Sequence, residues 1–263
     1  MNFLLNNRLV LVFIGPFFLG CLSVFSFQPF NLTLINFVIF PILFWIITYI
    51  SKKSKNTYRK KPHLINLFYV GYFFGIGFFL TGTYWISNSL NYDQTFRSLI
   101  PITIIILPLA LGFFFGIGSL MCGKYLKLDL KSIFIFSASF ATVDFLRAKI
   151  LTGFPWNLWA YSWSWFVEII QILNPIGLFA FNLITITLFL TPIILFFEKS
   201  KNKIIILGSF FLLFFINYLY GNFVINNNEL VTKNLIDNQK FINIKIISPN
   251  FDLKYNLDKT QTS

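Results

Sequence analysis

Long apolar stretches alternate with short polar segments along most of this chain, and this pattern predicts the fold class. A helix needs about 20 mostly apolar residues to cross a hydrocarbon layer of roughly 30 Å. Seven stretches come close to this length or exceed it. They cover residues 9–27, 31–50, 64–90, 98–121, 132–151, 166–197 and 203–221. We therefore expect residues 1–221 to form an all-α polytopic membrane domain with about seven transmembrane helices.

The last part of the chain, residues 222–263, has a different pattern. It is richer in polar residues and contains one β-branched stretch, "FINIKIIS" at 241–248, which is typical of a strand. A lone strand exposes unpaired backbone groups, and about 40 residues is near the lower size limit for folding without disulfides or metal. We therefore expect a tail that begins a larger domain and does not complete it.

Composition and charge narrow the class and give an orientation. The chain has 56% hydrophobic, 21% aromatic and only 11% charged residues, which excludes a water-soluble globule with an ordinary surface. With a cytoplasmic N-terminus, the inner segments carry thirteen Lys and Arg residues and the short outer loops carry three. This asymmetry favours that orientation and an extracytoplasmic tail. The net charge of +12 is then a topology signal near anionic membrane lipids, and we expect no nucleic-acid partner.

Residues that could hold a metal or form a disulfide are few. The two cysteines, Cys21 and Cys122, lie in separate apolar runs, and the single histidine, His63, has no second histidine near it. This arrangement offers neither a disulfide framework nor a cluster of metal ligands. We therefore expect no metal site and no cofactor.

Glycines recur at close spacing in the third and fourth runs. The patterns Gly71-x-x-x-Gly75 and Gly112-x-x-x-Gly116 would let helices approach closely, which matters in a membrane because packing replaces the absent hydrophobic drive. Packing of the helix bundle is the simplest interpretation. A site built against these glycines is an unspecific alternative.

A pair of opposite charges lies inside the fifth run. Placing a charge at mid-bilayer costs roughly 2.5–3.5 kcal/mol on insertion scales, so such residues are informative. Asp144 and Arg147 are three residues apart and therefore share one face of a helix. Two interpretations stay open: a structural pair in which Arg147 extends to the outer interface, or a role in binding a lipid headgroup or substrate.

Four of the six tryptophans lie in the stretch "LTGFPWNLWAYSWSW", residues 151–165. Trp156, Trp159 and Trp163 follow helical spacing and would share one face if the segment after Pro155 were helical. Aromatic side chains of this kind collect at the level of the lipid headgroups. The pattern alone therefore predicts an interfacial helix that anchors the outer side of the membrane.

The same region carries a resemblance. "DFLRAKILTGFPWNLWAYS" is similar to the signature of bacterial apolipoprotein N-acyltransferases, and three further stretches agree in order and spacing. These are "FSFQPFNL", "GYFFGIGFFLTGTYWISNSL" and "INIKIISPNFDLKYNLD", the last resembling the first strand and loop of the family's extracytoplasmic nitrilase-like α/β domain. The match covers essentially the whole chain, and its "LTGFPW" core is fairly specific.

The resemblance implies an enzyme of the bacterial inner membrane. Such an enzyme moves an acyl chain from a phospholipid donor to the free amine of a diacylglyceryl-cysteine lipoprotein, through a thioester on a cysteine assisted by a Glu and a Lys. It also implies that the tryptophan-rich loop shapes the entrance for lipid and lipoprotein. The candidate entrance residues are Asp144, Arg147, Gly153, Phe154, Pro155, Trp156, Tyr161 and Tyr255.

The chain also departs from the family pattern. No cysteine follows Cys122, and the sequence ends at Ser263, before the segments that carry the family's catalytic Glu, Lys and Cys. Asp144 replaces the usual Glu, Ala148 the usual Gly, and Tyr255 stands where a Trp is common. We therefore expect no catalytic residue in this chain and no activity from it alone.

Three hypotheses follow. In the first, the chain is the membrane portion of an apolipoprotein N-acyltransferase, truncated or split from its nitrilase-like domain. In the second, it works together with a separately encoded nitrilase-like partner. The alternative from another class is a stand-alone seven-helix binding or transport module, which would need polar groups paired near the bilayer midplane.

Overall fold

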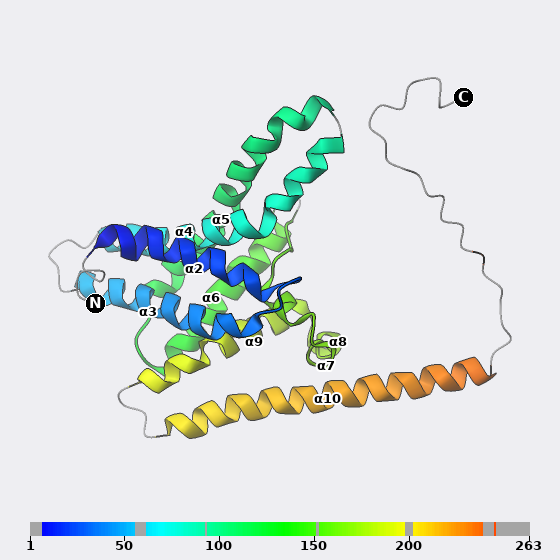
Figure 1. Ribbon diagram of the computed structural model, residues 1–263. Coiled ribbons are helices and arrows are strands. Elements are labelled where there is room, and N and C mark those ends of the chain that lie inside the picture. The colour runs from blue at the N-terminus through cyan, green and yellow to red at the C-terminus, as the bar shows by residue number, and fades with distance from the viewer. Residues whose placement is uncertain are drawn as a thin grey trace, which may run out of the picture.

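The computed structural model describes residues 7–55, 62–92, 94–150, 153–197, 202–238 and 245, and in these residues it is built of helices (Figure 1). The described α-helices are α2 (Gly15–Ser23), α3 (Asn36–Lys55), α4 (Pro62–Thr83), α5 (Ile100–Gly123), α6 (Leu130–Lys149), α7 (Val167–Ile170), α8 (Leu173–Ile176), α9 (Leu178–Leu190) and α10 (Lys203–Asn238). A π-helical turn, η1 (Val10–Ile14), precedes α2. The 3₁₀ segments are η2 (Val24–Ser26), η3 (Thr33–Ile35), η4 (Tyr84–Tyr92), η5 (Gln94–Leu99), η6 (Trp159–Trp163) and η7 (Thr191–Phe196).

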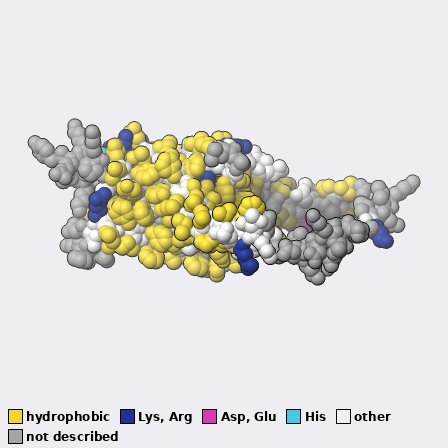
Figure 2. Space-filling model, turned by 90° about the horizontal axis from the view of Figure 1, so that it is seen from above, with side chains coloured by type: hydrophobic (Ala, Val, Ile, Leu, Met, Phe, Trp, Pro, Cys, Tyr) yellow, Lys and Arg dark blue, Asp and Glu magenta, His cyan; other side chains and the backbone are white. Residues whose placement is uncertain are grey.

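Most of the apolar runs become helices of membrane-spanning length. Among the described residues, five helical segments are long and apolar enough to cross a membrane. They are Thr33–Lys52, His63–Tyr92, Gln94–Gly123, Leu178–Phe196 and Lys203–Asp237. Figure 2 shows a face covered mainly by hydrophobic side chains, with Lys and Arg near its borders. The all-α membrane fold is therefore confirmed, while the number of seven crossings stays a prediction.

Two of the predicted runs do not form helices that are long and apolar enough to cross a membrane by themselves. The first is helical over Val10–Ser26, which is shorter than a full span. The fifth becomes α6, which has 20 residues but includes two lysines besides Asp144 and Arg147. These charges lower its apolar character, and α6 packs against α5 and α9 within the bundle.

The sixth run, predicted as 166–197, is not one helix. The structure divides it into α7, α8 and α9, with η7 completing the last segment. Gly177 has a φ of +79°, which an α-helix cannot contain, and it separates α8 from α9. The spanning part begins only at Leu178, so the excess length of this run forms short turns at one end of the bundle.

The seventh run continues beyond its predicted end at residue 221. α10 extends to Asn238 and has 36 residues, which corresponds to about 54 Å, against roughly 30 Å for a hydrocarbon layer. Figure 1 shows α10 beneath the other helices, with its C-terminal half projecting past them. The predicted strand at 241–248 lies outside the described residues, apart from Lys245, which has no regular structure.

The glycine patterns lie in the most extensive helix contact of the described residues, between α4 and α5. A Cβ placed on Gly71 would meet the carbonyl oxygen of Phe115, and one on Gly75 would lie 2.7 Å from the Cα of Gly112. Across the same contact, the Ser119 hydroxyl donates a 2.6 Å hydrogen bond to a backbone carbonyl of α4. The prediction that these glycines serve close packing is confirmed.

We expect Gly71→Ile to separate α4 from α5 and to lower the free energy of unfolding by about 1–3 kcal/mol or more, because the new side chain collides with backbone that cannot move aside. Thermal unfolding in detergent micelles measures the loss. Gly208→Ile is the matched control, since nothing lies within 4 Å of a Cβ at Gly208 on α10. Equal stability of the two variants would contradict close packing as the role of Gly71.

Candidate functional site

The charged pair on α6 is fully buried. Nη2 of Arg147 lies 3.0 Å from Oδ1 of Asp144, and both side chains have no exposed surface. Arg147 therefore does not extend to the surface, while the structural pair that the first of the two interpretations assumed is present. A buried charge is tolerated only when it is paired and hydrogen-bonded. The surroundings supply partners for both carboxylate oxygens of Asp144 and for Nη1 and Nη2 of Arg147, while Nε of Arg147 has none among the described residues.

Arg147 ties the tryptophan-rich loop to α6. Its Nη1 donates to the backbone carbonyls of Phe154 (2.7 Å) and Trp156 (2.8 Å), so the backbone on both sides of Pro155 wraps around the guanidinium. The amide of Phe154 donates back to the Arg147 carbonyl at 3.0 Å. The Phe79 ring of α4 lies 5.1 Å from the guanidinium carbon, which is close enough for a cation–π contact. Arg147 thus fixes the loop after α6.

Asn182, to which no motif or spacing in the sequence pointed, completes the network. Its amide nitrogen donates a 2.9 Å hydrogen bond to Oδ2 of Asp144, and its amide oxygen accepts from the backbone amide of Ala160 at 3.1 Å. Asn182 therefore connects α6, α9 and η6 in one buried unit. The available signal was a lone asparagine within the apolar run of α9, because a polar side chain at that depth needs a partner.

The tryptophans do not form the predicted interfacial helix. Asn157 has a φ of +57° and Leu158 is extended, so the chain bends between Trp156 and η6. Trp156 is 47% exposed, whereas Trp159 is completely buried and Trp163 is 4% exposed. The helical spacing was misleading because a bent backbone sends these side chains in different directions.

Trp159 lies instead at the centre of the bundle core. Its ring contacts five phenylalanines at centroid distances of 4.5–6.3 Å. These are Phe27, Phe40, Phe74, Phe78 and Phe115. Trp159, a residue of the loop, therefore packs against the turn after α2 and against α3, α4 and α5. The loop is held by aromatic packing as well as by Arg147.

A pocket of about 330 Å³ opens beside this loop. It is lined by residues from three stretches that are far apart in the sequence. They are Val24, Phe27, Gln28, Pro29 and Phe30 from η2 and the turn after it, Thr81, Gly82, Tyr84 and Trp85 from the end of α4 and η4, and Asn157, Tyr161 and Ser164 from the loop. We call this cavity the loop pocket. The same three stretches carried the family resemblance, and the fold brings them together.

The rim of the loop pocket is aromatic. The rings of Trp85 and Trp156 stack at 5.3 Å with an interplanar angle of 19°, and the indole nitrogen of Trp85 donates to the Gly82 carbonyl at 3.0 Å. Tyr161 reaches the pocket from η6. Burial raises the pKa of its phenol, against an opposing effect of the Arg147 charge. The phenol therefore stays neutral at physiological pH and can both donate and accept a hydrogen bond.

The predicted entrance residues are thus brought together, with one exception. Asp144 and Arg147 lie beneath the loop, Trp156 and Tyr161 lie at its surface, and the backbone of Phe154–Trp156 connects them. Gly153 has a φ of +76°, and a Cβ there would come within 2.5 Å of the Ala148 carbonyl oxygen, so the turn out of α6 requires glycine. Tyr255 lies outside the described residues.

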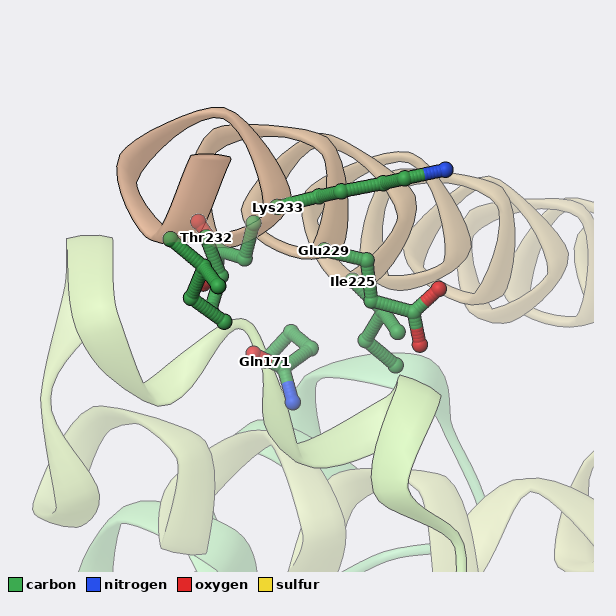
Figure 3. A pocket seen from close by; sticks show the side chains of 7 residues that line it. Gln171, Ile225, Glu229, Thr232 and Lys233 are labelled. Atoms are coloured by element: carbon green, nitrogen blue, oxygen red, sulfur yellow. The ribbon is translucent and has the colours of Figure 1, made fainter. Parts of the chain in front are cut away.

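A second cavity, of about 490 Å³, lies between α7 and the C-terminal half of α10. Figure 3 shows Gln171 on one side and Ile225, Glu229 and Thr232 on the other, with the Lys233 side chain directed away along α10. Its lining shares no residue with the loop pocket. Among the described residues, its lining includes none of the candidate entrance residues.

Comparison with known proteins identifies the family. The family described as "Apolipoprotein N-acyltransferase N-terminal domain" matches residues 19–191, which include α3–α6 and the loop that Arg147 holds. The chain belongs to the apolipoprotein N-acyltransferase family. The resemblance found in the sequence motifs is therefore confirmed, and the loop pocket lies within the matched region.

Individual members of the apolipoprotein N-acyltransferase family agree. The enzyme of that name from Rhodopseudomonas palustris is 30% identical over 177 residues, which are 67% of this chain and 32% of that protein. The one from Bradyrhizobium diazoefficiens is 33% identical over 66% of this chain and 31% of its own length. The one from Rickettsia prowazekii is 30% identical over 80% of this chain and 40% of its own length. The chain thus spans about a third of the curated relatives that it matches first.

Proposed function

We propose that this chain forms the membrane portion of an apolipoprotein N-acyltransferase, in which the loop pocket admits the phospholipid acyl donor and the diacylglyceryl-lipoprotein acceptor. One observation carries the proposal. Three stretches that resemble the family converge on a single aromatic pocket, and its main loop is fixed by a buried arginine. An entrance of this kind suits lipids, because indole and phenol rings pair an apolar body with a polar edge.

The loop pocket lies on the extracytoplasmic side in this proposal. The thirteen Lys and Arg residues of the segments predicted as inner would face the cytoplasm. The C-terminal end of α6 would then face outward from the inner membrane. α10 then leaves the membrane on the same side as the loop pocket. The segment after it would carry the beginning of the nitrilase-like domain.

The thioester step requires a nucleophile that the membrane portion does not present. The sequence has two cysteines; Cys122 is completely buried within α5, and Cys21 is half-buried within α2. A thiolate that attacks a phospholipid ester must reach the ester carbonyl. We propose that a nitrilase-like domain, joined or separately encoded, supplies the Cys, Glu and Lys above the loop pocket.

The proposed chemistry is a double displacement. The thiolate attacks the donor ester, a thioester forms, and the lysophospholipid leaves with a proton on its alkoxide oxygen. The lipoprotein amine then attacks the thioester, an amide forms, and the thiol is released. The membrane portion contributes by holding both lipids near the reacting carbon.

The proposal predicts that Trp156→Ala weakens substrate binding without preventing membrane insertion. Loss of the stacked pair with Trp85 should reduce labelling by a photoreactive diacylglyceryl-cysteine lipopeptide by about two- to tenfold, in line with roughly 0.5–1.5 kcal/mol for an aromatic pair. The measurement uses the full chain in lipid nanodiscs. Labelled peptides are then mapped by mass spectrometry, and we expect them around Phe27–Phe30 and Tyr161.

The matched control is Trp165→Ala. Trp165 is 44% exposed, almost as much as Trp156, but its ring stacks on Phe166 and its indole donates to Thr33, whereas Trp156 stacks on Trp85, which lines the loop pocket. Labelling should be unchanged in this variant. Uniform labelling of all exposed helices, or an equal loss in both variants, would refute the proposed entrance. Solute flux through vesicles that contain the chain would instead support the transport alternative.

A further inference from the structure

A large apolar groove lies on the other side of the tryptophan-rich loop, between α6, α9 and α10. Its volume is about 700 Å³, and most of its lining comes from α9 and α10. Phe134 and Ala138 of α6 contribute to one wall. We call this cavity the α9–α10 groove. It shares no lining residue with the loop pocket.

The groove exists because α10 contacts the bundle at separated points. Near its middle, Asn217 donates a 3.1 Å hydrogen bond to the Ile169 carbonyl of α7. Near its beginning, Lys203 donates to the Leu195 carbonyl at 3.2 Å. Between these points, Phe214 touches Trp163 at a centroid distance of 5.0 Å. The space beside these contacts is left open.

The groove has the length of one lipid acyl chain. On α10 its lining extends from Phe210 to Tyr220, which corresponds to about 15 Å of helix, or half of a hydrocarbon layer of roughly 30 Å. This part of α10 belongs to a segment apolar enough to span a membrane. An opening at that depth faces the hydrocarbon layer, so the acyl chains of membrane lipids are the groups that can fill it.

The ends of the groove differ in chemistry. Phe134 and Phe210 form one end, where their rings are 6.5 Å apart. Asn217 and Tyr220 line the other end, and Tyr220 brings a hydroxyl that can donate a hydrogen bond to an ester oxygen. The Thr185 hydroxyl on the α9 wall is buried and has no hydrogen-bond partner among the described residues. A polar end and an apolar end match the ester and the methyl terminus of an acyl chain.

From these observations we propose that the α9–α10 groove binds one acyl chain of a resident membrane phospholipid, with its methyl end at Phe134 and Phe210 and its ester end near Asn217 and Tyr220. The Thr185 hydroxyl can donate to an ester carbonyl oxygen. The bound chain fills the space that protein side chains leave open, and it thereby joins α10 to α9 by packing. The site does not depend on acyl transfer at the loop pocket.

Photolabelling by phospholipids tests this site. The full chain is reconstituted in vesicles of phosphatidylethanolamine and phosphatidylglycerol, with a phosphatidylethanolamine that carries a diazirine on one acyl chain. A diazirine at the methyl end should label Phe134, Phe210 and Leu213 several-fold more than Ile105, an exposed residue of α5. A diazirine next to the ester should instead label Ile172 and Tyr220.

Ala138→Phe would narrow the groove and should reduce labelling of Phe210 several-fold. Ala110→Phe is the matched control, because Ala110 is exposed on α5 outside the groove and should leave labelling of Phe210 unchanged. Unchanged labelling of Ile105 in both variants shows that the fold is kept. Labelling of the groove at the level of Ile105, no effect of Ala138→Phe, or a groove closed to lipid by a protein helix would each overturn the proposal.

Discussion

Arg147→Met should lower the free energy of unfolding by about 3–5 kcal/mol, because it leaves the Asp144 carboxylate buried without its charge partner. It also removes the donors to the carbonyls of Phe154 and Trp156, so the tryptophan-rich loop loses its attachment to α6. Unfolding of the reconstituted chain by a denaturing detergent, followed by circular dichroism, measures this change. Labelling of the loop pocket should fall in parallel.

Two further variants separate charge burial from a general effect of losing arginine. Arg8→Met removes an arginine that is exposed and bonded to Asn66, so it should cost less than about 1 kcal/mol. The double variant Asp144→Asn with Arg147→Met should be more stable than Arg147→Met alone, since no unpaired charge is left in the core. Equal stability of the single and double variants would show that the buried charge is not the cause.

Trp159→Ala should also be strongly destabilising, with a loss of about 3–5 kcal/mol, because it opens a cavity among five phenylalanines at the centre of the bundle. We expect the thermal unfolding midpoint in detergent to fall more than for any exposed aromatic residue. Since Trp159 connects the turn after α2 to α4 and α5, the loop pocket should lose its shape as well.

Trp159→Phe distinguishes packing from hydrogen bonding. The indole nitrogen of Trp159 has no hydrogen-bond partner among the described groups, so phenylalanine removes part of the ring and no bond. Trp159→Phe should therefore lower the free energy of unfolding by much less than Trp159→Ala does. If phenylalanine and alanine proved equally harmful, an interaction of the indole nitrogen would have to be the main contribution.

Part of the candidate site could be predicted from neighbouring residues. The three-residue spacing of Asp144 and Arg147 was enough to predict a pair on one helix face, and the geometry confirms the pair. The need for glycine at position 71 followed from the GxxxG spacing. Each of these predictions rests on helix geometry, which relates residues a few positions apart.

Other features of the site depend on contacts between distant segments. Asn182 reaches Asp144 across 38 positions of the chain, and the Thr33 hydroxyl donates to the Ser162 carbonyl across 129. No periodicity in the sequence relates such residues. The helical spacing of the tryptophans even favoured the wrong arrangement, because a residue with positive φ, Asn157, interrupts the segment.

The order of residues was enough to predict a helical membrane protein and the positions of most of its helices, because hydropathy over about 20 residues decides whether a segment can enter hydrocarbon. Its motifs also determined the family. The burial of Arg147, the place of Trp159 in the core and the continuation of α10 to Asn238 beside an open groove became visible only in the folded chain. These outcomes depend on which helices pack together, since burial and pairing arise from neighbours in space and not from the order of residues along the chain.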